Sequence, residues 1–456
     1  MSKAYIVTDI GYGDCGKGTI VDFLARQYKS SLVIRHNGGS QAAHNVVTPQ
    51  GVHHTFSQFG SASLTENSKT YLSRFMLVNP LNMINEANHL ISIGVKDIWK
   101  TMFIDKDSLV ITPWHVYANR IREVLRNNNR HGSCGEGIGE TRCDYLQVPQ
   151  MSLRIRDLMN DRLGDKLRTI CDYKFGQMKV LENEYGVALD GLYSDMFTDD
   201  NYIIDLIHEY QYFVSQLNVV DIDFLSKQSE LAEVIIFEGA QGALLDEWYG
   251  FHPYTTWSTT TGANAKQLLS EIGYNETVEH VGVMRSYTTR HGDGPFVSED
   301  KNLEATLREL HNEYHPFQGA FRCGYLDMIA HKYAIDVCGD IDSLAVTHLD
   351  YLSKNSAWKI CDKYYFDSTK LSQHLFYEHD GLVSGIRVSD NRDLVRQNML
   401  SDSLRFAVPS LTEINRQCDA EILCEYIESM FMKKVFIKSF GPMSSQKEIS
   451  KSVFPN

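Results

Sequence analysis

An early glycine-rich segment carries one acidic and one basic side chain. Residues 11–19 read GYGDCGKGT, with the GxxxxGK spacing of a phosphate-binding loop. Gly18 stands where that motif places Ser or Thr for magnesium, so the nearest oxygen ligand for a metal is Asp14. Small residues let backbone N–H groups approach an anion, and Lys17 adds a full positive charge. The segment predicts a phosphate site; an ordinary glycine-rich turn is the alternative.

A second segment of small and polar residues contains a histidine. Residues 35–45 read RHNGGSQAAHN, and the glycines and alanines leave room for close backbone approach. The imidazole of His44 can donate to an oxygen of a transferring phosphoryl group. We expect it to face the same sheet edge as Asp14, although a lone histidine is more often structural.

Strand-like and helical patterns alternate around these two segments. The sequence predicts a strand at Ala4–Thr8, a helix at Lys17–Gln27 and a strand at Ser31–Arg35, which is the rhythm of a parallel sheet. Four later runs are short and rich in Val and Ile, and are predicted as buried strands: Ala232–Phe237, Val278–Met284, Ser343–Thr347 and Lys434–Ser439. Ligands in such sheets bind outside the carboxyl ends of the strands, where both segments lie.

The fold class predicted from this alternation is α/β. We expect a large, mainly parallel, P-loop-like sheet flanked by helices, with helical and small β insertions. Residues 158–229 are charged, aromatic and helical in pattern, and are predicted as a helical insertion. Since no repeat or Pro-rich linker divides the chain, residues 1–456 are expected to form a single domain.

Composition narrows the functional class. A formal charge of -14 disfavours a broad nucleic-acid surface, because phosphate-backbone binding needs clustered Lys and Arg. The opening apolar run is too short for a signal peptide or a membrane span. Nine cysteines are scattered without a CxxC pair, which favours neither a disulfide framework nor a zinc site. We therefore expect a cytoplasmic protein that binds neither nucleic acid nor membrane.

A series of segments in chain order resembles the adenylosuccinate synthetase family. Beyond the two segments above, the resemblance rests on the following stretches: residues 132–139 (GSCGEGIG), 237–246 (FEGAQGALLD), 253–256 (PYTT), 287–290 (YTTR), 294–296 (GPF), 322–327 (RCGYLD), 347–350 (THLD) and 439–442 (SFGP). They span essentially the whole chain. One such segment alone is weak evidence for a family, but this many matches in the same order do not arise by chance.

The resemblance implies a two-step ligation. Asp14 would take the N1 proton of IMP, so that the 6-oxygen attacks the γ-phosphate of GTP while His44 stabilises the transferring group. The amine of aspartate would then displace phosphate to give adenylosuccinate. The family further implies Mg²⁺ held by Asp14 and the carbonyl of Ala43, and a homodimer. Asp350 matches the carboxylate that reads the guanine edge, with a capping or turn aspartate as the alternative.

The same resemblance assigns site residues to each role. The catalytic set is Asp14, Lys17, His44 and Gln241. The set for GTP is Gly13, Gly16, Lys17, Gly18, Asn45, His348, Asp350, Ser439, Gly441 and Pro442. The set for the IMP-like acceptor is Gln41, Ser133, Cys134, Gln241, Leu245 and Thr256. The set for the amine substrate is Gly319 and Arg322.

Departures from the family pattern concentrate in the acceptor and amine pockets. Around the acceptor phosphate, Gln41 replaces Asn, Cys134 replaces Thr, and Val148 stands about where a partner subunit would donate Arg. Three nearby arginines are candidates to compensate: Arg142, Arg154 and Arg156. In the amine loop, residues 315–322 retain Arg322 alone from an arginine-rich run. Each lost hydrogen bond to a carboxylate costs roughly 1.5 to 3 kcal/mol.

These departures leave three functions to weigh. The first is GTP-dependent formation of adenylosuccinate from IMP and aspartate. The second is the same phosphorylate-then-aminate chemistry on another oxo-purine or with another amine. The third is a nucleotide-binding regulator without turnover, which the joint presence of Asp14, Lys17 and His44 disfavours.

Overall fold

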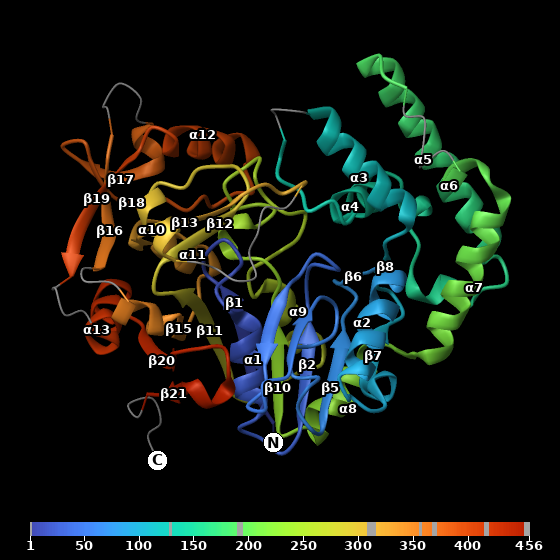
Figure 1. Cartoon of the computed structure of the whole chain (residues 1–456), viewed down its shortest axis with the longest axis horizontal. Coiled ribbons are helices and arrows are strands. Elements are labelled where there is room, and N and C mark those ends of the chain that lie inside the picture. The colour runs from blue at the N-terminus through green and yellow to red at the C-terminus, as the bar shows by residue number, and fades with distance from the viewer. Residues whose placement is uncertain are drawn as a thin grey trace.

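Ten strands form one large sheet at the centre of the molecule (Figure 1). The computed structural model describes residues 2–126, 130–188, 195–307, 316–354, 358–366, 372–414 and 419–450. In sheet order the strands are β21 (Lys447–Ile449), β20 (Lys434–Ser439), β15 (Ser343–Thr347), β11 (Val278–Arg285), β1 (Lys3–Asp9), β10 (Val234–Glu238), β2 (Ser31–Arg35), β5 (Ser68–Leu72), β7 (Met102–Asp105) and β9 (Asn218–Val220). Neighbours pair in parallel except β20 and β21, so the mainly parallel sheet is confirmed.

Both faces of this sheet are buried, as the continuous apolar strands predicted. In β1, Tyr5 and Val7 pack on the side of helix α1 (Lys17–Ala25), whereas Ala4 and Ile6 pack on the side of α8 (Ile222–Leu231) and α9 (Ala263–Glu271). Successive residues of a strand point to opposite faces, so an unbroken apolar run is what a doubly covered sheet requires. This packing fixes β1, and the loop after it, in the middle of the sheet.

The remaining helices cover the sheet or build additions to it. They are α2 (Pro80–Ser92), α3 (Pro113–Arg126), α4 (Ile138–Gln147), α5 (Leu163–Tyr185), α6 (Asp195–Thr198), α7 (Asp200–Gln216), α10 (Lys301–Thr306), α11 (Met328–Cys338), α12 (Leu394–Leu404) and α13 (Ala420–Phe431). Helices α3 to α7 form the arm on the right of Figure 1. In the described part of the chain, none of the helices combines the length and apolar character that crossing a membrane would need.

The short strands form hairpins and small sheets beside the main one. Strand β3 (His44–Val47) pairs with β4 (His53–Phe56), β6 (Leu77–Val78) with β8 (Leu109–Val110), and β12 (Thr288–His291) with β13 (Phe321–Gly324). A separate sheet, on the left of Figure 1, consists of β14 (Leu326–Asp327), β16 (Trp358–Tyr365), β17 (Phe376–His379), β18 (Leu382–Ile386) and β19 (Val408–Ile414). These are the small β insertions that the sequence predicted.

The predicted helical insertion at residues 158–229 needs one correction. It contains α5, α6, α7 and most of α8, but β9 lies inside it and forms the edge of the main sheet beside β7. Asn218 anchors this edge by donating from Nδ2 to the carbonyl of Met102 at 2.9 Å. Three residues are too few for a strand period to show in the sequence.

Candidate active site

The loop after β1 closes around a buried carboxylate, Asp9. Its Oδ1 accepts the N–H groups of Gly11 (2.8 Å) and Gly13 (3.3 Å), and its Oδ2 accepts that of Cys15 (2.9 Å). The ammonium of Lys17 lies 3.0 Å from Oδ2 in an ion pair closed to solvent. Burial alone would raise the pKa of Asp9, but the charge of Lys17 and these donors hold it below its usual value. Asp9 is therefore a fixed anion inside the loop.

This arrangement changes which donors a phosphate can use. Lys17 also donates to the carbonyl of Gly13, so two of its three N–H donors are engaged within the loop. The donors left for a bound phosphate are the third N–H of Lys17 and the first-turn N–H groups of α1. That helix starts after Gly16 in a left-handed conformation (φ 85°), and no side chain caps it.

His44 lies in β3, directly against α1. A Cβ at position 18 would lie 2.7 Å from the Cβ of His44, which explains why Gly18 replaces the hydroxyl residue of the phosphate-loop motif. The Nδ1 of His44 is 2.5 Å from Oε1 of Glu238, at the end of β10. Ser61 donates to the same carboxylate through its backbone N–H (2.9 Å) and its hydroxyl. The imidazole is thus fixed beside the phosphate loop.

Charges decide which ring nitrogen of His44 carries the proton. Burial would raise the pKa of Glu238, but Arg35 and His44 lower it to about 2, so the carboxylate is ionised and can only accept. Nδ1 must then be the donor. Burial lowers the pKa of His44 although Glu238 raises it, so the free imidazole is neutral near pH 7. Its Nε2 is left for a ligand.

Gln241 lies in the turn after β10, against the phosphate loop. A Cβ at Gly13 would lie 3.5 Å from the Cα of Gln241, and one at Gly242 would lie 2.2 Å from the carbonyl oxygen of Gly11. Gln241 itself adopts φ 56°, a left-handed conformation that costs energy in a residue with a side chain. Its buried amide atoms have no hydrogen-bond partner among the described residues, and the same holds for Gln41. Both amides are available to a ligand.

The predicted acceptor residues converge from three loops. The side chains of Gln41 and of Ile138, at the start of α4, both lie close to the point where a Cβ on Gly39 would stand. Ser40 donates to Glu136 at 3.2 Å, which joins this loop to residues 133–139. The ring of Trp257 covers Gly139, with its Cδ1 atom 3.2 Å from the Cβ position.

Two further acceptor residues are fixed by hydrogen bonds, and a third is a thiol. Thr256 donates its backbone N–H to the carbonyl of Leu245 at 2.9 Å. Ser133 donates its hydroxyl to Asn119 at 3.0 Å. Burial raises the pKa of the Cys134 thiol to about 12, so it stays protonated and is a weak donor at most.

The candidate arginines for the acceptor phosphate have other partners. Arg154 donates to the carbonyl of Asp107 and Arg156 pairs with the carboxylate of the same residue. Arg142 and Arg154 both lie over the ring of Tyr145, at 5.5 Å and 5.2 Å. Val148, where the resemblance places an arginine, follows the last turn of α4. Compensation by Arg154 or Arg156 would require breaking these contacts.

Asp14 offers the chemistry that a magnesium site needs. Its carbonyl accepts from Arg285, and in the described part of the chain no hydrogen bond engages its carboxylate. The carboxylate of Asp14 and the backbone carbonyl of the exposed Ala43 are hard oxygen donors of the kind that Mg²⁺ prefers. Among the described residues no cluster of three His, Cys, Asp or Glu side chains could hold a metal alone. A magnesium ion there would take its other ligands from phosphate and water.

The predicted guanine-binding residues His348 and Asp350 follow Thr347, which contacts the phosphate loop. Thr347 donates its hydroxyl to the carbonyl of Cys15 at 2.8 Å and also contacts Nδ1 of His348. His348 adopts φ 58° and lies edge-on to Tyr287, with ring centroids 5.7 Å apart. Asp350 follows in the 3₁₀ helix η6 (Leu349–Lys354).

A C-terminal loop adds to the predicted GTP-binding residues. It carries Ser439, Gly441 and Pro442, and Met443 in it forms an isolated bridge to Val47 of β3. The loop therefore lies beside the hairpin of His44. Asn45 in the same hairpin accepts at its Oδ1 from His53 and Thr55, so only its amide N–H groups stay open to a nucleotide.

Arg322 is held by the protein. One of its terminal nitrogens donates to the carbonyls of Gly292 (3.0 Å) and Gly294 (3.1 Å), and the other pairs with Glu299. Gly319, at φ 100°, packs on the Cα of Gly292. His315 of the same loop lies outside the described residues. Three of the five N–H donors of Arg322 are thus engaged before any carboxylate substrate binds.

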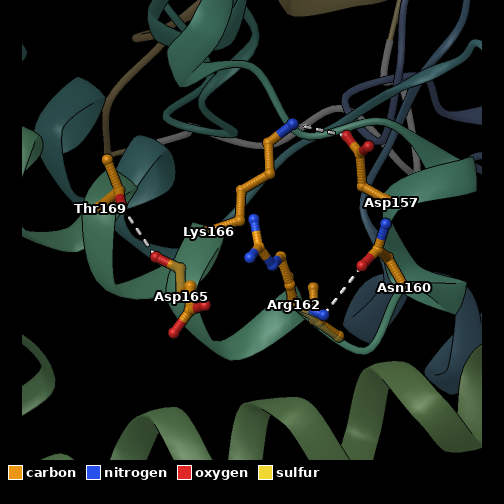
Figure 2. A pocket seen from close by; sticks show the side chains of 7 residues that line it. Asp157, Asn160, Arg162, Asp165, Lys166 and Thr169 are labelled. Atoms are coloured by element: carbon orange, nitrogen blue, oxygen red, sulfur yellow. Dashed lines mark hydrogen bonds and ion pairs between the residues drawn. The ribbon is translucent and has the colours of Figure 1, made fainter.

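A hollow of about 300 Å³ lies elsewhere, on the helical insertion (Figure 2). It is lined by residues between Asp157 and Thr169 at the start of α5. Lys166 pairs with Asp157 at 2.7 Å, and Asn160 accepts the backbone N–H of Arg162. None of the predicted site residues lines it.

Sequence reasoning missed four residues that organise the site. Asp9 and Glu238 are acidic residues at the carboxyl ends of β1 and β10, where ligands bind in such sheets, so their position was an available signal. Arg285 ends β11 in the same way. Lys447 has no signal in the sequence, because its partners are backbone carbonyls.

A doubly covered parallel sheet with an anion-binding loop, a histidine and a carboxylate at one edge defines a nucleotide-dependent α/β enzyme. The family model for adenylosuccinate synthetase matches residues 6–418. The chain is 32% identical to the adenylosuccinate synthetase of Clostridium beijerinckii over 371 residues, covering 80% of this chain and 82% of the relative. For Clostridium perfringens the identity is 30% over 368 residues, with the same coverage. The chain belongs to the adenylosuccinate synthetase family, whose members are carbon–nitrogen ligases.

Solved structures show the same fold. A fully ligated adenylosuccinate synthetase from Plasmodium falciparum superposes with a TM-score of 0.76 at 20% identity, covering 98% of this chain and 99% of the other. A succinoaminodeoxyadenylate synthetase of cyanophage S-2L, bound to dGMP and dATP, superposes with a TM-score of 0.55 at 15% identity, covering 98% and 95%. The predicted α/β architecture is thereby confirmed.

Proposed function

We propose that this protein ligates L-aspartate to IMP, with GTP converted to GDP and phosphate. The observation that carries the proposal is the meeting of three elements around one loop. The Asp14 loop touches Gln241 through Gly13 and touches His44 through Gly18. A base, an imidazole and an amide are thus gathered where a phosphate donor and a purine can meet.

The first step is phosphoryl transfer. The Asp14 carboxylate takes the N1 proton of the purine, the 6-oxygen attacks the γ-phosphorus, and the bond to the β-phosphate oxygen breaks to release GDP. Glu238 orients His44 so that Nε2 faces the transferring group. The third N–H of Lys17 donates to a phosphate oxygen. Bound magnesium, with Asp14 and Ala43 among its ligands, would neutralise phosphate charge.

The second step forms the carbon–nitrogen bond. The aspartate amine adds to C6 of the phosphorylated purine, loses a proton, and phosphate leaves with the former 6-oxygen. The unpaired amides of Gln241 and Gln41 supply hydrogen bonds to the purine nucleotide. The two remaining N–H donors of Arg322 face the amine substrate's carboxylates. We further propose a homodimer that acts in the cytoplasm, because the chain carries no CxxC pair or other cysteine pattern of a disulfide framework.

A turnover assay tests this assignment. The protein is mixed with GTP, Mg²⁺, IMP and aspartate, and phosphate release is followed with the absorbance change of a 6-amino-substituted purine. We expect both signals together, and neither in Asp14→Asn. The control is Asp223→Asn, an exposed position in α8. Full activity of Asp14→Asn would remove Asp14 as the base.

A second acceptor deserves a parallel assay. Gln41 and Cys134 alter the acceptor loops, and the cyanophage neighbour of the same fold is bound to dGMP. dGMP keeps a 6-oxo group but adds a 2-amino group and lacks the ribose 2′-hydroxyl. Turnover with dGMP but not IMP would select the other oxo-purine. Absence of phosphate release with every acceptor would leave a nucleotide-binding protein without ligase turnover.

A further inference from the structure

The C-terminal hairpin contains a lysine in an unusual setting. Lys447 starts β21 and pairs in register with Ser439 at the end of β20, so its side chain lies under the connecting loop. Its ammonium contacts three successive carbonyls, those of Gly441 (3.0 Å), Pro442 (3.3 Å) and Met443 (3.1 Å). The residue is 7% exposed.

The ammonium acts there as a bound cation. Three carbonyl dipoles aimed at one point repel one another unless a positive charge lies between them. The recorded contacts of the Lys447 ammonium within the described residues are all to backbone carbonyls. The acidic group that acts on it is Asp22 of α1, which is itself paired with Arg26. Burial lowers the pKa of Lys447 to about 8, while Asp22 raises it.

The loop it holds is the one assigned to the donor purine. Gln446 reinforces the turn by accepting from the backbone N–H of Met443 (3.0 Å), and Phe440 donates its N–H to the carbonyl of Gln446 (2.9 Å). Through Met443 the loop meets Val47 in the hairpin that bears His44. A change in the loop would therefore act on donor binding before it acts on chemistry.

We propose that Lys447 is a positioning residue for the phosphate donor: its ammonium gathers the carbonyls of residues 441–443 and so holds the donor-purine loop closed against β3. This inference rests on the proposed GTP-dependent function. Loss of the charge opens the loop and weakens GTP binding, while the transfer step in the saturated enzyme stays intact.

Substitution with steady-state kinetics and direct binding tests the role. Lys447→Met removes the charge and keeps the length, and Lys447→Arg restores a cation. The control is Lys434→Met, an exposed lysine on β20 paired with Glu428. We expect KM for GTP to rise about tenfold in Lys447→Met with kcat within about threefold, which corresponds to about 1.4 kcal/mol of binding free energy. Lys447→Arg recovers most of this loss, and the control matches the wild type.

A pH series on the unmodified protein gives a second, independent readout. KM for GTP in the wild type should rise as pH increases from 7 to 9, through the pKa of Lys447, and should stay flat in Lys447→Arg. Unchanged GTP affinity in a folded Lys447→Met, a loss in kcat alone, or a flat wild-type profile would each overturn the inference. A wild type that neither binds nor hydrolyses GTP would instead overturn the proposed function.

Discussion

At the scale of single residues, the proton on His44 is the central question. The neutral imidazole uses its one N–H to bind Glu238, so Nε2 can donate to phosphate only when the ring gains a second proton. Bound triphosphate adds negative charge beside the ring and therefore raises the pKa of His44. We therefore expect the ionised Glu238 and a bound phosphate together to make the imidazolium the reactive form.

Glu238→Gln tests this proton placement. A neutral amide still accepts a hydrogen bond but gives no charge to favour the imidazolium, so kcat should fall about 10- to 100-fold with little change in KM for GTP. The alkaline limb of the pH–rate profile, where the imidazolium loses its proton, should also move to lower pH, because the pKa of His44 loses the raising influence of Glu238. Glu279→Gln, at the amino end of β11, serves as the control. Unchanged kcat in Glu238→Gln would contradict the argument.

Asp9 and Lys17 form the second residue-scale test. Asp9→Asn leaves a buried ammonium without its counterion and should lower the free energy of unfolding by about 3 kcal/mol. Denaturant titration followed by fluorescence measures it. The double variant Asp9→Asn with Lys17→Met removes both charges and should recover part of that loss while abolishing turnover. If the double variant is no more stable than Asp9→Asn, the ion pair does not account for the effect.

At the scale of elements, six of the ten strands of the main sheet were predicted from the sequence, whereas their order in the sheet was not. The ranges predicted at Ser31–Arg35, Ser343–Thr347 and Lys434–Ser439 coincide with β2, β15 and β20, because buried parallel strands are continuous apolar runs. The edge strand β9 was missed since three residues carry no period. Pairing between distant segments, such as Val47 with Met443, leaves no local signal either.

In the candidate site too, some residues were predicted from local sequence motifs, whereas the contacts of others depend on segments far apart in the chain. The phosphate loop and the His44 segment are contiguous motifs, and the structure brings them together through Gly18. The anion inside the loop was missed, although the position of Asp9 at the carboxyl end of a strand was a signal for it. Arg322 was assigned to the amine from its place in a motif, whereas its contacts with Glu299 depend on the fold of the β12–β13 hairpin. Its role, like the other residue assignments, stays a prediction.

Glu299→Gln tests what Arg322 does in that hairpin. If the guanidinium receives a substrate carboxylate, Glu299 competes for it, and removing that negative charge should lower KM for aspartate by about three- to tenfold. The control is Glu304→Gln within α10. Asp300, next to Glu299 in the chain, is not used because it caps α10. An unchanged or raised KM for aspartate in Glu299→Gln would make Arg322 a structural residue.

Helix α11 contains a pH-dependent element. Its N-cap, Asp327, accepts from the N–H of Ala330 and the hydroxyl of Tyr364, and burial raises its pKa to about 6. The folded state thus binds this proton more tightly than the unfolded one, so the group's contribution to stability falls between about pH 4 and pH 6 and stays low above it.

Asp327→Asn should remove that cost. The stability difference between variant and wild type should be about 1–3 kcal/mol more favourable to the variant at pH 7.5 than at pH 4, where the carboxyl is protonated in the folded state and about half protonated in the unfolded state. Thermal unfolding at the two pH values measures the change. A difference between variant and wild type that does not vary with pH would show that Asp327 is ionised at no cost in the fold.

At the scale of the whole molecule, the ligand-free protein is not arranged for maximum stability. Its net charge of -14 opposes polyanions at long range, so an anionic ligand has to be bound by local donors in the loops. The buried amides of Gln41 and Gln241 lack partners among the described residues, and each such group costs about 1–3 kcal/mol. Gln241 adds a left-handed backbone. We propose that binding of a purine nucleotide recovers this cost.

Gln241→Leu separates stability from ligand binding. Replacing an unsatisfied amide with an apolar side chain of similar size should raise the unfolding temperature of the free protein, because the desolvated amide is gone. In the wild type, acceptor nucleotide at 100 times its dissociation constant should add about 2.7 kcal/mol of stability, and in Gln241→Leu most of this gain should vanish. Thermal unfolding with and without IMP, and with dGMP in parallel, measures both effects. A variant that is less stable when free, yet fully stabilised by nucleotide, would mean that the Gln241 amide is satisfied inside the protein and faces no purine.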